Sequence, residues 1–97
     1  MNQKIHTAEM DDLMRGILSL NTLEECYAFF EDLCTVSELQ SLGQRFEVAG
    51  MLRRGMTYNE VARATGASTA TISRINRALN YGNDGYDLIL NRRAESE

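Results

Sequence analysis

Three segments of the chain begin with the same helix-start signal, a threonine followed three residues later by a glutamate. These segments are Thr22–Glu25, Thr35–Glu38 and Thr57–Glu60. In such a capping box the threonine side chain accepts a hydrogen bond from the third helical amide, and the glutamate accepts one from the amide of the threonine. Apolar residues recur at helical spacing behind each start, and the chain contains no proline. The sequence therefore predicts an all-α fold of about six helices.

The apolar spacing also predicts where these helices lie. One amphipathic helix is expected before the first box, with an apolar stripe formed by Met10, Leu13, Met14, Ile17 and Leu18. Further helices are expected at about 23–34 and about 36–54, and a short last one near 86–91. The helix at 23–34 has apolar residues around much of its circumference, which favours burial on more than one side, as at a dimer interface. In the long helix, Gly43 and Gly50 suggest close helix approach, because glycine otherwise costs helix stability.

Residues 57–79 predict two short helices joined at a sharp turn. Thr57 caps the first helix, and Val61 is expected to face inward. Gly66 can supply the turn with a positive φ, which residues bearing a Cβ adopt at a cost. Ile72 and Ile75, three residues apart, are expected to point back into the core. Together with the small Ala62 between the helices, this spacing is typical of a helix-turn-helix.

The outward face of the second short helix suits a recognition helix, with small polar residues near its start and arginines further along. Arginine binds phosphates and guanine edges well because its guanidinium is a planar, permanently charged donor. The residues expected to contact double-stranded DNA are Ser68, Thr69, Ala70, Thr71, Ser73, Arg74, Arg77, Arg63 and Arg54.

The net charge of −4 hides an uneven distribution along the chain. Residues 1–42 hold two basic side chains against eight acidic ones, a net charge of −6. Residues 43–80 hold six arginines against two glutamates, a net charge of +4, and residues 81–97 carry −2. The positive charge is therefore concentrated in the segment that contains the expected helix-turn-helix.

Several other classes of protein are disfavoured. No apolar stretch approaches a membrane span and no signal peptide is visible, so a cytoplasmic protein without membrane contact is expected. Cys26 and Cys34 are expected to be reduced packing residues. His6 is the only histidine, and neither a metal site nor a cofactor is expected. The chain shows no nucleophile–base pair and no phosphate-binding loop, so we expect no catalytic residues and no enzyme activity.

Over roughly residues 35–80 the sequence resembles the Trp repressor superfamily, and most closely its Trp-repressor-related YerC/YecD branch. The motifs that carry the resemblance are Leu42–Arg45 and Leu52–Gly55 in the long helix, and Gly66-Ala67, Ala70–Ile72 and Arg74 around the turn. The resemblance implies an intertwined homodimer that places two recognition helices in successive major grooves of a pseudo-palindromic site.

The resemblance also implies a ligand pocket. Arg45 and Arg74 stand where two family arginines sandwich the tryptophan corepressor, and Thr35 matches a threonine that lines the pocket. Ile75, however, replaces the glycine that follows the second arginine, and Ala78 replaces a serine on the ligand side. A β-branched side chain at position 75 would fill space that an indole needs. We therefore expect no tryptophan corepressor, and an unidentified small-molecule effector is left open.

These observations predict a single helical domain over residues 1–97. Residues 1–34 are interpreted as dimerisation helices, 35–80 as the long helix with the DNA-binding helix-turn-helix, and 81–97 as a short C-terminal helix and tail. The predicted function is a dimeric, sequence-specific transcriptional regulator, a repressor that occupies its operator. The alternative is a helical protein–protein interaction module with incidental DNA binding, suggested by the acidic first 42 residues.

Overall fold

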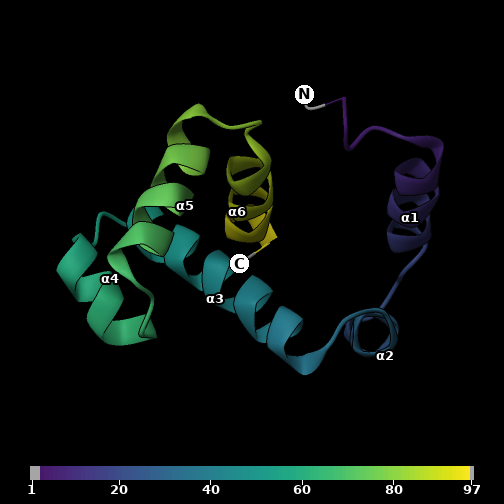
Figure 1. The fold of residues 1–97 in the computed structure, drawn as a ribbon, viewed down its shortest axis with the longest axis horizontal. Coiled ribbons are helices and arrows are strands. Elements are labelled where there is room, and N and C mark those ends of the chain that lie inside the picture. The colour runs from purple at the N-terminus through teal and green to yellow at the C-terminus, as the bar shows by residue number, and fades with distance from the viewer. Residues whose placement is uncertain (1–2, 97) are drawn as a thin grey trace. The chain divides into compact units, whose positions relative to one another are not determined.

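The computed structural model describes residues 3–96, and these residues form six α-helices and no strand (Figure 1). The helices are α1 (Ala8–Leu18), α2 (Leu23–Leu33), α3 (Val36–Arg53), α4 (Tyr58–Thr65), α5 (Thr69–Tyr81) and α6 (Gly85–Ser96). The all-α fold predicted from the sequence is confirmed. None of these helices is both long and apolar enough to cross a membrane.

The chain divides into two compact units, Met1–Leu39 and Gln40–Glu97. The boundary lies inside α3, so the first turn of this helix belongs to the first unit and the rest belongs to the second.

Side-chain caps start the helices of the first unit. The Thr7 hydroxyl accepts from the amide of Met10 at 3.2 Å at the start of α1. At the start of α2, Thr22 accepts from the amide of Glu25 at 3.0 Å. The Glu25 carboxylate accepts from the amide of Asn21 at 2.8 Å. The sequence predicted that the Glu25 carboxylate would accept from the amide of Thr22. This prediction is wrong by one residue, because the carboxylate reaches the amide of Asn21 instead.

The apolar side chains of α1 and α2 lie at or near the surface of their unit. Both helices are fully described, and neither contains a buried residue. In α1, Leu18 is 83% exposed, and in α2 Leu23 is 74% exposed. The rings of Phe29 and Phe30 form an edge-to-face pair with centroids 5.4 Å apart. The helical periodicity was predicted correctly, but it does not produce a core within this unit.

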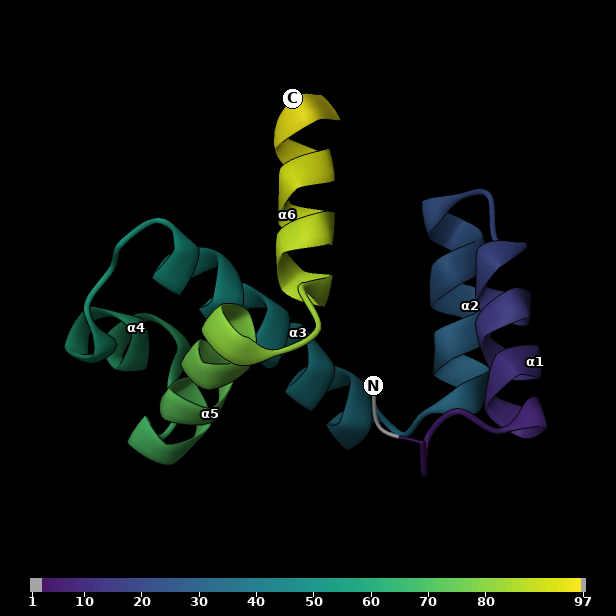
Figure 2. The same cartoon turned by 90° about the horizontal axis from the view of Figure 1, so that it is seen from above.

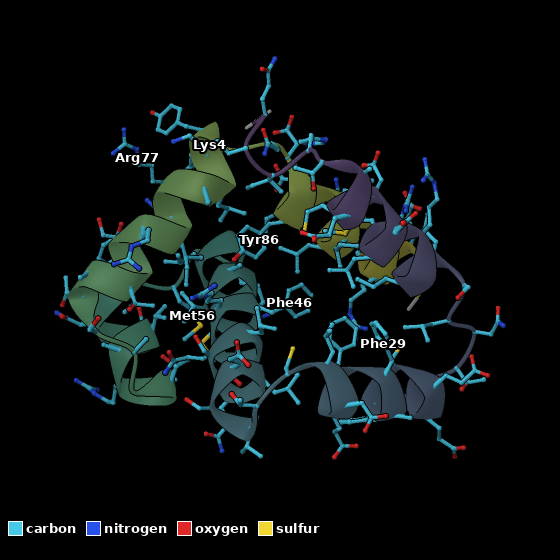
Figure 3. All side chains as sticks on the ribbon, turned by 45° about the vertical axis from the view of Figure 1, so that its right-hand side comes forward. Lys4, Phe29, Phe46, Met56, Arg77 and Tyr86 are labelled. Atoms are coloured by element: carbon cyan, nitrogen blue, oxygen red, sulfur yellow. The ribbon has the colours of Figure 1, made fainter. Side chains whose placement is uncertain are left out.

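The second unit contains a compact core. Its buried apolar residues come from α3, α4, the turn after α4, and α5, and they are Val48, Ala49, Val61, Ala67, Ile72 and Ile75. Around them pack Met51, Leu52, Met56, Ala62 and Tyr86. In Figure 3 the labelled Met56 lies between α3 and the α4–α5 pair. The core therefore fixes α4 and α5 against the C-terminal half of α3.

The last helix is longer than expected. It spans Gly85–Ser96, whereas the sequence predicted only about 86–91. Asp84 precedes it with a φ of 62°, and the Asp84 carbonyl accepts from the amide of Leu88 at 3.0 Å. After this turn α6 leaves in a different direction from α5 (Figure 2). The residues that follow position 91 continue the helix because most of them, arginine, alanine and glutamate, are good helix formers.

The two glycines inside α3 do not mark close helix approach among the described residues. A Cβ at Gly43 would meet nothing within 4 Å, and one at Gly50 would meet only the guanidinium of Arg54, at 3.4 Å. The expectation of a close helix neighbour at these glycines is therefore not met within one chain.

Candidate nucleic-acid interface

Helix α4 begins with a complete capping box. The amide of Glu60 donates to the Thr57 hydroxyl at 3.2 Å, and the amide of Thr57 donates to the Glu60 carboxylate at 3.1 Å. The bond from the Thr57 amide, and secondarily the one from its hydroxyl, lowers the pKa of the Glu60 carboxyl, because both favour the charged form. The start of α4 is thus fixed by an ionised side chain at neutral pH.

The turn between α4 and α5 is defined by a glycine and a threonine. Gly66 has a φ of 75°, as expected from the sequence, and its amide donates to the carbonyl of Ala62 at 2.8 Å. The Thr65 hydroxyl donates to the carbonyl of Val61 at 2.8 Å and accepts from the amide of Ala67 at 3.1 Å. The chain therefore reverses within a few residues, and its polar backbone groups are satisfied locally.

A side chain from α3 holds this turn in place. The Gln44 amide group donates to the carbonyl of Thr65 at 3.2 Å, across 21 residues of sequence. The sequence predicted no structural role for Gln44 or Thr65. The only signal for Gln44 was its place in the Leu42–Arg45 motif, since a polar residue in an amphipathic helix predicts no particular partner.

Buried side chains set the orientation of α5. Ile72 is fully buried and Ile75 is 5% exposed, and both belong to the core around Val48 and Val61. Helices α4 and α5 pack against each other. Because Ile72 and Ile75 lie on the inner face of α5, the opposite face is turned to solvent.

That outer face carries most of the residues expected to contact DNA. Thr69, Ala70, Ser73, Arg74 and Arg77 are exposed. Figure 3 shows the labelled Arg77 projecting away from α5. The side chains of this face are small and uncharged at the start of α5 and cationic one to two turns later.

Ser68 and Thr71 have a structural role at the start of α5. The Ser68 hydroxyl accepts from the amide of Thr71 at 3.1 Å and donates to the Thr71 hydroxyl at 3.0 Å. Thr71 is half-buried, whereas Ser68 is exposed. The Ser68 hydroxyl therefore caps the helix that presents the outer face, and the Thr71 hydroxyl accepts a hydrogen bond from this cap.

The other arginines of the positive segment differ in their surroundings. Arg45, Arg54 and Arg63 are exposed. Arg53 instead pairs with Asp87 of α6, with a nitrogen–oxygen distance of 2.9 Å, and also donates to the side chain of Asn91. Arg53 thus connects the end of α3 with α6, a contact across 34 residues that no sequence pattern indicated.

The four expected pocket residues are divided between the two units. Thr35 caps α3 in the first unit, where it forms a complete capping box with Glu38. Arg45, Arg74 and Ile75 belong to the second unit, where the two arginines are exposed and Ile75 lies in the core.

Two cavities in the second unit are lined in part by Phe46, and neither includes any of the four expected pocket residues in its lining. The first, of about 450 Å³, lies between α3 and α6 and includes Gly50, Arg54 and Leu90 in its lining. The second, of about 400 Å³, is lined by Ala78, Tyr86 and Ile89 among others. Among the described residues, no group of three or more histidine, cysteine, aspartate or glutamate side chains is placed to hold a metal ion.

Comparisons with known proteins agree with this architecture. The Trp repressor protein family matches the chain over residues 8–94. YerC of Bacillus subtilis (strain 168), a protein of uncharacterised function, is 60% identical over 94 residues, which cover 97% of this chain and 90% of YerC.

Two crystal structures are also similar to the chain. A TrpR like protein from Eubacterium eligens ATCC 27750 superposes with a TM-score of 0.92 at 58% identity, covering 96% of each chain. A candidate Trp repressor from Staphylococcus aureus superposes with a TM-score of 0.91 at 52% identity, covering 95% of this chain and 92% of the other.

Proposed function

Because this chain belongs to the Trp repressor protein family, we propose that it is a sequence-specific transcriptional regulator that represses by occupying its operator. In this proposal a homodimer binds a pseudo-palindromic site in the cytoplasm, without tryptophan as corepressor. Membership of the family makes the chain a DNA-binding regulator.

The observation that carries the proposal is the outer face of α5. Ile72 and Ile75 anchor its inner face in the core, so the residues on the other side project into solvent from a rigid support. Short side chains at the start of a helix let the backbone approach base edges in the major groove, and later arginines can reach guanine or phosphate. The proposed DNA-contacting residues are Ser68, Thr69, Ala70, Thr71, Ser73, Arg74, Arg77, Arg63 and Arg54.

The homodimer is supported by the apolar surface of the first unit. Leu23, Tyr27 and Leu33 of α2 are each at least half exposed. Apolar residues on several sides of one helix are typical of an obligate interface, where they become buried in the assembly. A dimer would also present two α5 helices to half-sites spaced about one turn of DNA apart.

The exclusion of tryptophan is supported by Ile75. Its side chain is 5% exposed and belongs to the core. Isothermal titration calorimetry of the protein with tryptophan should therefore show no saturable heat at micromolar concentration. A micromolar site would contradict this part of the proposal and leave the DNA-binding part intact.

The proposal is tested by selecting bound sequences from a random duplex library, with and without tryptophan. We expect a palindromic motif in both conditions. Arg77→Ala should weaken binding to the selected duplex by about tenfold to a hundredfold, whereas Arg15→Ala, an equal loss of charge in the acidic first unit, should not. Light scattering should show that both variants keep the oligomeric state of the wild type.

A protein–protein interaction module is the second candidate function. The net charge of −6 over residues 1–42 and the exposed apolar residues of α2 favour it. If no motif is enriched and Arg77→Ala has no effect on DNA binding, this second function replaces the first.

A further inference from the structure

The hydrogen bond between Gln44 and Thr65 links α3 to the turn that precedes the outer face of α5. Its donor is the side-chain amide of Gln44, and its acceptor is the partly buried backbone carbonyl of Thr65, 3.2 Å away. We infer that Gln44 is a positioning residue for DNA recognition, which sets where α5 starts and thereby sets the preference for the operator over other duplexes. This inference rests on the proposed function and adds a residue that acts through the turn and not on the DNA itself.

Gln44 lies at the edge of the core, on the same face of α3 as Val48. The two residues are one helical turn apart, which is about 6 Å along the helix axis. Val48 is fully buried and Gln44 is half-buried. The α4–α5 pair therefore meets this face of α3 at two neighbouring points, through the apolar packing around Val48 and through the hydrogen bond from Gln44.

These two points constrain the α4–α5 pair in different ways. Apolar packing is non-directional and depends on the buried area, so it holds helices together without fixing every small rotation between them. A hydrogen bond weakens when its distance or its angle departs from the preferred values. The bond from Gln44 therefore limits how far the turn at Thr65 can shift along α3 or around it.

Local hydrogen bonds connect the position of Thr65 to the first residues of α5. The Thr65 hydroxyl accepts from the amide of Ala67 at 3.1 Å, and Ala67 is 6% exposed and belongs to the core. Ser68 follows directly and is the N-cap of α5, where its hydroxyl accepts from the amide of Thr71 at 3.1 Å. A shift at Thr65 is therefore transmitted within a few residues to the start of the helix.

The start of α5 is the part of the outer face where a small shift has the largest consequence. Thr69 and Ala70 are exposed there, and their short side chains cannot extend to recover a contact with a base edge. Arg74 and Arg77 have long side chains that can follow a phosphate over the same shift. Base contacts determine sequence preference, whereas phosphate contacts do not. Loss of the Gln44 bond should therefore reduce discrimination between duplexes more than it reduces DNA binding in general.

The test compares two duplexes by fluorescence anisotropy with the full-length protein, the duplex selected from the random library and a scrambled duplex of equal length and composition. Gln44→Met keeps the length of the side chain and removes its donor. We expect its affinity for the selected duplex to fall about tenfold, the effect of one hydrogen bond, and its affinity for the scrambled duplex to stay unchanged.

A second variant tests whether a donor at position 44 is sufficient. Gln44→Lys supplies a donor that can bond a carbonyl at a helix end. Its added charge should strengthen binding to both duplexes, but the ratio of the two affinities should return toward the wild-type ratio. A loss of stability alone would not move this ratio, because the affinities are compared at a temperature where circular dichroism shows each variant to be fully folded.

The matched control makes the same substitution one turn earlier in α3. Gln40 is exposed, so Gln40→Met should change neither affinity. Nuclear magnetic resonance spectra of the DNA-free protein give a readout that does not depend on the duplex. Gln44→Met should shift the amide signals of Ala67 and Thr69 as well as those around position 44, and Gln40→Met should leave the signals of Ala67 and Thr69 in place.

Three outcomes would overturn the inference. The first is a wild-type preference that Gln44→Met leaves intact, because Gln44 would then have no part in discrimination. The second is an equal loss of preference in Gln40→Met, which would indicate a general effect of substitutions in α3. The third is a set of shifted amide signals confined to residues around position 44. A wild-type protein that prefers no duplex would instead overturn the proposed function, and this inference with it.

Discussion

The two units of the chain use helices in different ways. In Gln40–Glu97, six buried apolar residues from α3, α4, the turn and α5 form a core. In Met1–Leu39, neither α1 nor α2 contains a buried residue, although α1 has a regular apolar stripe. Amphipathic helices gain most of their stability from packing of the apolar face. The second unit therefore supplies much of its own packing, whereas the first presents apolar surface for contacts outside the unit.

The units also differ in charge. The first unit carries a net charge of −6 and the second a net charge of +2. Within the second unit, residues 43–80 carry +4, with arginine as the only basic residue type. Phosphate backbones attract the second set of charges and repel the first. The first unit is acidic and has exposed apolar residues, which favours contact with protein. The second unit has a core and a net positive charge, which favours contact with DNA.

The largest expected effect concerns this charge difference. If about three arginines per subunit contact phosphates, a dimer makes about six such contacts, and binding to a selected duplex should weaken by about a thousandfold between 50 and 200 mM salt. Fluorescence anisotropy at several salt concentrations measures the slope. Arg77→Ala should reduce the slope, and Arg15→Ala in the acidic unit should not. A flat response in the wild type would contradict an arginine-lined DNA face.

The next prediction concerns the difference in packing. Ile72→Ala should lower the free energy of unfolding by about 2–5 kcal/mol, because it removes a fully buried side chain and leaves a cavity in the core. Leu18→Ala in α1 should cost far less in a single chain, since Leu18 is 83% exposed. Urea denaturation at one fixed protein concentration compares the two variants, because assembly makes stability depend on concentration.

The outcome of this comparison shows whether the apolar surface of α1 is buried within the single chain or in the assembled protein. A large loss in Leu18→Ala that grows with protein concentration would show that this surface is buried in the assembled protein. A large loss that is independent of concentration would contradict the assignment of the core to the second unit alone.

A matched pair of glycines gives a smaller effect with opposite signs. Gly66→Ala should destabilise the protein by about 1–2 kcal/mol, because Gly66 has a φ of 75°. Gly43→Ala should stabilise it by about 0.5–1 kcal/mol, because Gly43 lies inside α3 and an added Cβ would meet nothing within 4 Å. Thermal melts followed by circular dichroism measure both. Destabilisation by Gly43→Ala would instead indicate that a neighbour approaches this glycine in the assembled protein.

Local signals in the sequence predicted the helices and the turn well. Periodicity located all six helices, and the positive φ of Gly66 followed from its place between two helical patterns. Inward-facing Val61, Ile72 and Ile75 were also predicted correctly. Each of these features depends on residues a few positions apart, so the sequence contains the relevant neighbours.

Features that depend on distant residues were not predicted. Gln44 contacts Thr65 across 21 residues, and Arg53 contacts Asp87 across 34. An arginine or glutamine on a helix surface has many possible partners, and the sequence does not rank them. The expected DNA contacts and the expected ligand pocket stay predictions, because each depends on a second molecule, a DNA duplex or a ligand, and not on the chain alone.

The smallest expected effect concerns the capping boxes, which occur in both units. Hydrogen bonds from Thr57 lower the pKa of Glu60, and those from Thr35 lower the pKa of Glu38. A lowered pKa in the folded state means that the unfolded chain binds the proton more tightly. The stabilisation is therefore complete above the ordinary value of 4.5 and is lost as pH falls through the folded-state pKa.

Glu60→Gln tests this linkage, because the glutamine can still accept a hydrogen bond but does not titrate. The variant should be less stable than the wild type near pH 7, and the difference should shrink as pH falls below about 4.5. Glu38→Gln should behave similarly in the first unit if that unit unfolds together with the second. Thermal melts at several pH values measure both. If only Glu60→Gln changes the pH dependence of the main transition, the two units unfold separately, and the contrast between them extends from packing and charge to cooperativity.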